Sequence, residues 1–79
     1  MARLPSERYL IQQAGAEVIL FEEFTEREVV RFDLLDKDAI ASACGTIFDS
    51  ELSVEDKCFA CFWCGYFYSR ATAFAKDSF

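Results

Sequence analysis

Eleven consecutive apolar or small residues, C-F-A-C-F-W-C-G-Y-F-Y, occupy positions 58–68 of a chain of 79 residues. They lie within the segment that we predict to be the last helix. A helix that is apolar around its whole circumference has to be covered on every side. A chain of this length has few other elements with which to cover it. The sequence therefore predicts that part of this helix is covered by a second copy of the protein or by another protein.

Length and composition indicate one folded domain, residues 1–79, near the size at which a single core supplies only a few kcal/mol of net stability. The apolar fraction is 53%, and it includes nine Phe, three Tyr and one Trp, which argues against disorder. An aromatic side chain buries about 150–250 Å². These rings must therefore dominate the core, an interface, or both.

The first half of the chain has the two-residue alternation of β-strands. Residues 8–33 predict a three-stranded antiparallel meander, because the links between the apolar segments are short. We expect residues 1–6 to be a lead-in, with Pro5 stopping regular structure. Residues 17–24 are apolar on both pleat faces at their centre, which is typical of a middle strand covered on both sides.

The pattern then changes to a helical period, which predicts helices over residues 36–50 and 53–75. Asp36 or Asp38 is placed to cap the first helix. The segment Ser53-Val54-Glu55-Asp56 has the form of a helix start, with acidic residues where the helix dipole favours them. The order βββαα predicts an α+β fold with both helices packed on one face of the sheet.

On a helical wheel, the last helix carries three rows of apolar side chains. The rows are Phe59, Phe62, Tyr66 and Ala73; Trp63, Phe67 and Phe74; and Cys58, Cys61, Gly65 and Tyr68. One row can pack on the first helix and another on the sheet, which leaves the third row without a partner. A homodimer is the simplest way to cover it, since two-fold pairs are the commonest oligomers. The alternative is a curled sheet that buries the helix within one chain.

The candidate interface with a second copy or a partner consists of the helix residues with rings and the glycine between them, which would let two backbones approach closely. These residues are Phe59, Phe62, Trp63, Gly65, Tyr66, Phe67 and Tyr68.

One pattern in the sequence suggests a metal site. It consists of the four cysteines, Cys44, Cys58, Cys61 and Cys64. Their C-x2-C-x2-C spacing matches part of a ferredoxin cluster motif, but Tyr68 stands where the next Cys is required. With Cys44 as fourth ligand, a zinc site is the alternative. On a helix, however, Cys64 is rotated by about 240° from Cys58. We therefore predict no metal and no cofactor, with the thiols packed as small apolar groups; a metal centre and a redox pair stay as lesser alternatives.

Catalytic motifs are absent from the sequence. It contains no His, the commonest general base, and its three glycines are isolated, so no phosphate loop is present. Glu22 and Glu23 could form a paired-carboxylate site with Glu26 or Glu28, but solvated strand ends explain them better. We expect a protein that is not an enzyme.

The net charge of −6 disfavours direct binding of nucleic acid or of an anionic membrane. The apolar run at 58–68 is also well short of the ~20 residues that a membrane span requires. Acidic side chains concentrate in residues 17–38, and Glu22, Glu23, Glu26 and Glu28 are a candidate face for a basic protein partner. The alternative is a solvated, charged sheet rim. With no signal peptide in view and free thiols, we expect a cytoplasmic protein.

Three segments, S-E-R-Y-L-I-Q-Q (6–13), I-L-F-E-E-F-T-E-R-E-V-V-R-F-D (19–33) and L-S-V-E-D-K-C-F-A-C-F-W-C-G-Y-F-Y (52–68), cover about half of the chain. In these segments the chain resembles small orphan accessory proteins of actinobacterial tailed phages. The resemblance implies a phage-borne protein in the host cytoplasm, acting as a virion or assembly component or as an inhibitor of a host protein. It implies no fold, activity or site residues.

The function that we predict is therefore a small, acidic, self-associating protein-interaction module. The alternatives are an acidic inhibitor of a nucleic-acid-handling or defence enzyme that acts through residues 17–38, a virion component and, least favoured, a zinc or iron–sulfur protein.

Overall fold

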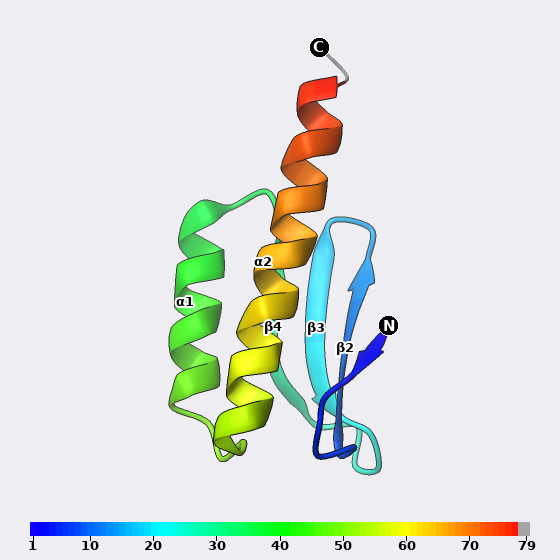
Figure 1. Cartoon of the computed structure of the whole chain (residues 1–79), viewed down its shortest axis with the longest axis vertical. Coiled ribbons are helices and arrows are strands. Elements are labelled where there is room, and N and C mark those ends of the chain that lie inside the picture. The colour runs from blue at the N-terminus through cyan, green and yellow to red at the C-terminus, as the bar shows by residue number, and fades with distance from the viewer. Residues whose placement is uncertain (78–79) are drawn as a thin grey trace.

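A computed structural model of the protein describes the backbone of residues 1–77 and the side chains of residues 1–73. Its elements, in chain order, are β1 (Ala2–Arg3), β2 (Tyr9–Ala14), β3 (Glu17–Glu22), β4 (Glu28–Asp33), α1 (Lys37–Phe48) and α2 (Val54–Asp77). The strands form one antiparallel sheet in the order β1-β2-β3-β4, and both helices cover the same face of it (Figure 1). The predicted α+β class and the placing of the helices on one face are confirmed, whereas the predicted number of three strands was wrong.

The additional strand, β1, lies in the segment that we predicted to be a lead-in. It pairs antiparallel with Leu10 and Ile11 of β2. Regular structure does stop at Pro5, because β1 ends at Arg3 and Pro5 lies inside the turn before β2, in which the Glu7 N–H donates to the Leu4 carbonyl at 2.9 Å. Proline is favoured inside such turns, since its φ is already suitable. A two-residue strand shows no alternation, so the sequence pattern could not indicate it.

One face of the sheet supplies most of the hydrophobic core. Ile11, Leu20 and Val30 are cross-strand partners on β2, β3 and β4, and partners in register share a face. Ile11 and Leu20 are fully buried beneath the helices, as is Val18. The expectation that β3 is covered on both sides was wrong, because both helices lie on this one face (Figure 1).

The starts of both helices are capped where the sequence predicts. Asp36 caps α1, and its carboxylate accepts from the backbone N–H groups of Asp38 at 3.0 Å and Ala39 at 3.2 Å. At the start of α2, the Ser53 hydroxyl oxygen accepts from the Asp56 N–H at 3.2 Å. These bonds satisfy N–H groups that a helix leaves free in its first turn.

The Asp56 carboxylate does not turn back on its own helix. It is 1% exposed, and it accepts from the Ser6 backbone N–H at 3.0 Å and from the Ser6 hydroxyl. Ser6 lies in the turn between β1 and β2, so this contact joins the N-terminal hairpin to the start of α2. A buried carboxylate needs such donors, because an unpaired one would be costly to remove from water.

The long helix α2 lies along the sheet beside α1 and then projects past the end of both (Figure 1). Its sheet-facing residues Ala60, Cys64 and Phe67 are in the core. A helix of 24 residues is about 36 Å long, whereas a strand of six residues spans about 20 Å. Within the described part of the chain, no helix has the length and apolarity needed to cross a membrane.

Candidate functional site

Three aromatic side chains on the outer side of α2 are open to solvent. Phe59, Phe62 and Tyr66 are 50%, 60% and 41% exposed. Their spacing of three and four residues places them on one face of the helix. The rings of Phe62 and Tyr66 stack, with centroids 6.4 Å apart and an interplanar angle of 16°. We call these three residues the aromatic stripe.

The aromatic stripe is held in place by its neighbours. The Trp63 ring, half-buried against the core, meets the Phe62 ring edge-on at 5.6 Å and the Tyr66 ring at 5.5 Å. The Arg70 guanidinium lies over the Tyr66 ring, 5.6 Å from its centroid. Aromatic and cation–π contacts of this geometry are favourable. The stripe is therefore an ordered surface.

A small apolar hollow lies at one end of the aromatic stripe. Cys58, Phe59 and Phe62 line it, and its walls carry almost no polar surface. The exposed parts of the three rings amount to roughly 300 Å² if each ring offers about 200 Å². That is within the size of the largest apolar patch on a typical monomer, which is often a functional one.

The other predicted interface residues lie elsewhere on α2. Phe67 is in the core at 8% exposure, and Tyr68 packs partly against it. Gly65 is exposed, and nothing lies within 4 Å of the position that a Cβ would take there.

The sequence predicted that one row lacks a partner without deciding which one. Cys61 and Tyr68 of the third row pack against the core, whereas the first row, which contains the aromatic stripe, faces solvent. The sequence could not show on which side of α2 the first helix lies. Phe74, which we assigned to the second row, has a side chain outside the described residues.

Three of the four cysteines meet where α1 and α2 pack together. Burial, with a smaller contribution from the nearby Cys44, raises the pKa of Cys61 to about 11 and that of Cys64 to about 12. Both are therefore neutral thiols near pH 7. Cys58 is exposed.

Among the side chains of residues 1–73, no three His, Cys, Asp or Glu groups are arranged to hold a metal ion. The geometry therefore gives no support to the zinc or cluster alternatives.

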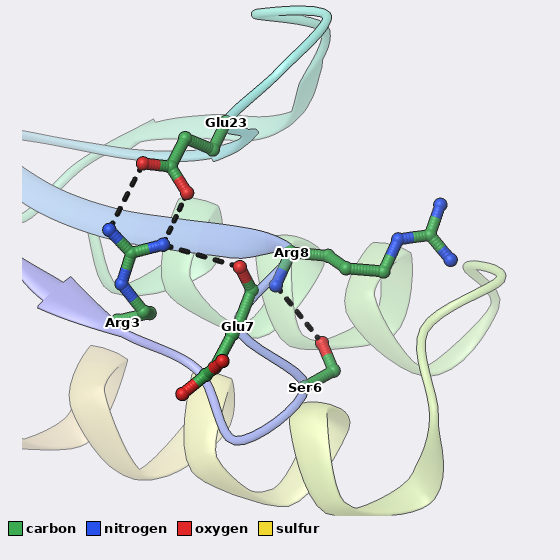
Figure 2. A network of polar contacts seen from close by, with 5 residues as sticks. All are labelled: Arg3, Ser6, Glu7, Arg8 and Glu23. Atoms are coloured by element: carbon green, nitrogen blue, oxygen red, sulfur yellow. Dashed lines mark hydrogen bonds and ion pairs between the residues drawn. The ribbon is translucent and has the colours of Figure 1, made fainter.

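At the end of β3, two carboxylates of the candidate acidic face meet arginines from the N-terminal hairpin. Figure 2 shows the first of these contacts, between Arg3 and Glu23. Arg3 binds Glu23 through both guanidinium Nη groups, and its Nη1 also donates to the Glu7 carbonyl at 3.2 Å. The hydrogen bond from Arg3 lowers the pKa of Glu23. The Arg8 guanidinium lies 3.9 Å from the Glu22 carboxylate.

On β4, Arg31 pairs with Glu28 and donates to Glu17 at 2.6 Å. The hydrogen bond from Arg31 lowers the pKa of Glu28. Glu26 lies in the turn with a φ of 57° and has no ion pair within the described side chains. Three of the four predicted carboxylates are thus compensated by arginines, which reduces the negative charge that this face offers to a basic partner.

The sequence did not reveal a second apolar surface, on the sheet face that the helices leave open. Leu10 and Phe21 are partners in register, and Ile19 lies two residues from Phe21 on the same side. None of these three residues belongs to the core beneath the helices. Leu10 is buried, and Ile19 and Phe21 are half-buried, so this surface is less open to solvent than the aromatic stripe. The run of apolar residues in β3 was the available signal, and we interpreted it as a strand covered on both sides.

A shallow hollow between the start of β4 and the end of α1 gathers polar side chains, including Glu28, Asp49, Ser50 and Glu51. Glu28 is paired with Arg31, and the Ser50 hydroxyl donates to the Ile47 carbonyl at 2.5 Å. The hollow therefore joins no nucleophile to a base among these groups.

No protein-family model, curated protein or solved structure matches this chain. The resemblance to phage accessory proteins stays a prediction. Of the surfaces described above, the aromatic stripe combines the greatest ring exposure with fixed geometry.

Proposed function

We propose that this protein is a non-enzymatic interaction module that forms a homodimer through the aromatic stripe of α2. The observation that supports this function is the 41–60% exposure of three adjacent rings on one face of a helix. Apolar patches of this size on soluble proteins are often functional. A two-fold dimer covers it most simply, because the same patch then faces itself.

The area involved sets the expected affinity. Two stripes would bury roughly 600 Å² of ring surface, and the flanking side chains would bring the total toward the low end of the 1,200–2,000 Å² of stable interfaces. Association also costs several kcal/mol in lost translational and rotational freedom. We therefore expect a dissociation constant of about 1–100 µM.

A dimer formed through α2 leaves free the sheet face that the helices do not cover and the candidate acidic face around Glu26. We propose that the module acts by binding another protein through these surfaces, in keeping with the resemblance to phage accessory proteins. Because arginines compensate Glu22, Glu23 and Glu28, the acidic-inhibitor alternative is less well supported than a mainly apolar contact.

The test is size-exclusion chromatography with light scattering over about 0.5–500 µM protein, a range that brackets the expected dissociation constant. We expect the wild type to change from monomer to dimer over this range and Phe62→Glu to stay monomeric. Phe24→Glu is the matched control, since Phe24 is 82% exposed in the turn after β3, away from α2. Circular dichroism checks that each variant is folded. A wild type that is monomeric throughout, or a Phe24→Glu variant that loses the dimer as Phe62→Glu does, would overturn the proposal.

A further inference from the structure

The exposed residues along the outer side of α2 form one row, with a charged residue at each end and aromatic rings between them. Glu55, Phe59, Phe62, Tyr66 and Arg70 are all exposed, and they succeed one another at intervals of three or four residues. The acidic residue lies at the N-terminal end of the row and the basic residue at the C-terminal end. Two such rows are therefore complementary in charge when they run in opposite directions.

We infer that the second copy binds with its α2 antiparallel to the first, about a two-fold axis close to Phe62. This inference rests on the proposed self-association. With the axis between positions 62 and 63, Phe59 of each copy lies opposite Tyr66 of the other. Glu55 of each copy then lies opposite Arg70 of the other, at the two ends of the stripe. The interface thus has an aromatic centre between two ion pairs, the arrangement of apolar core and polar rim that protein interfaces show.

The two charges are available for this pairing. Within the described side chains, neither Glu55 nor Arg70 forms an ion pair. The Arg70 guanidinium lies over the Tyr66 ring at 5.6 Å, which holds its charge beside the stripe. The two residues are 15 positions apart, about 22 Å along the helix. Each ion pair therefore lies clear of the other.

A parallel arrangement would be less favourable. It would bring Glu55 of one copy to Glu55 of the other and Arg70 to Arg70, and like charges in contact oppose association. It would also align the two helix dipoles, whereas antiparallel helices place opposite partial charges side by side.

The stripe also lies on a side of α2 that a second helix can reach. Ala60, Cys64 and Phe67 face the sheet, and Cys61 lies beside Cys44 of α1. Figure 1 shows α1 along one side of α2 only. The second copy therefore has room along the opposite side without displacing either element.

Charge reversal tests the orientation. In an antiparallel homodimer of Glu55→Arg, each new arginine lies opposite Arg70 of the other copy. In a homodimer of Arg70→Glu, each new glutamate lies opposite Glu55 of the other copy. We expect each variant to raise the dimer dissociation constant about tenfold, since two exposed ion pairs become two repulsive contacts. An equimolar mixture of the two variants should form a heterodimer with near wild-type affinity, because both of its charge pairs are again opposite in sign. Sedimentation velocity in low salt measures all three constants.

Asp38→Arg is the control, because Asp38 is an exposed acid in the first turn of the other helix. This variant shows how a reversed charge in the first turn of a helix affects folding when the residue lies outside the proposed interface. We expect its dimer dissociation constant to equal that of the wild type. Single variants that dimerise as well as the wild type would overturn the antiparallel arrangement while the proposed dimer stands. In a parallel dimer each residue faces its own copy, so charge reversal only replaces one contact between like charges by another. A wild type that does not dimerise would overturn both.

Discussion

The carboxylate of Asp56 holds together two parts of the chain that are 50 residues apart in sequence. It is 1% exposed, and both of its described donors are groups of Ser6. Asp56→Ala removes the acceptor and leaves these two donors to find water. It also removes a negative charge from the first turn of α2, where the helix dipole favours one.

The expected loss follows from these contacts. Hydrogen bonds to an ionised acceptor contribute about 1.5–3 kcal/mol each, and the charge at the helix start adds up to about 1 kcal/mol. Ser6 is an exposed residue, so its donors recover part of this by bonding to water. We therefore expect Asp56→Ala to lower the free energy of unfolding by about 2–3 kcal/mol. In a domain of this size, that corresponds to a fall in Tm of about 10–20 °C.

Urea and thermal unfolding, followed by the fluorescence of Trp63 at about 0.1 µM protein, measure this loss without a contribution from dimer formation, because this concentration lies below the whole expected range of the dissociation constant. Asp38→Ala is the matched control, an exposed acid in the first turn of α1, and should cost less than about 0.5 kcal/mol. A double-mutant cycle with Ser6→Ala should give a coupling energy of about 1 kcal/mol or more. An Asp56→Ala loss no greater than that of the control, or no coupling in the cycle, would refute the reasoning.

Two further predictions concern the helices. Gly45 and Gly65 lie in helix interiors with open space at the position of a Cβ. Gly45→Ala and Gly65→Ala should each raise the free energy of unfolding by about 0.5–1 kcal/mol, because alanine favours a helix more than glycine does. Urea unfolding that shows either variant to be less stable than the wild type would contradict this prediction. The raised pKa of Cys64, about 12 against 9.0, means that the folded protein keeps a proton that the unfolded chain releases between these values. The contribution of Cys64 to stability should therefore be constant below about pH 9 and be lost as the pH rises toward 12. Urea unfolding from pH 8 to 11 should show a smaller fall in stability for Cys64→Ala than for the wild type.

The parts of the fold that depend on neighbouring residues could be predicted from the sequence. Asp36 and Ser53 cap the two helices, because a cap needs only its own side chain and the next three N–H groups. The change of period from two to 3.6 indicated where sheet gives way to helix, and the α+β class follows from it.

The parts that depend on distant residues could not be predicted in this way. Pro5 marks a stop, but only the pairing with β2 shows that a strand precedes it. Phe59 and Cys61 are equally apolar in sequence, and only the position of α1 decides that Cys61 is covered and Phe59 is not. The partners of the acidic residues are also distant, since Arg3 reaches Glu23 across β2.

Because the strand order follows the chain order, each strand meets its partner as soon as the two are synthesised. Short loops close at little entropic cost, so the sheet and α1 can assemble while α2 is still within the ribosome. Until α2 emerges, the apolar side of the sheet that it will cover stays exposed to solvent. The hairpin at the N-terminus also lacks its hydrogen bonds to Asp56. A pause in translation after α1 has emerged from the ribosome and before α2 has done so would prolong the stage at which the nascent chain is most prone to aggregate.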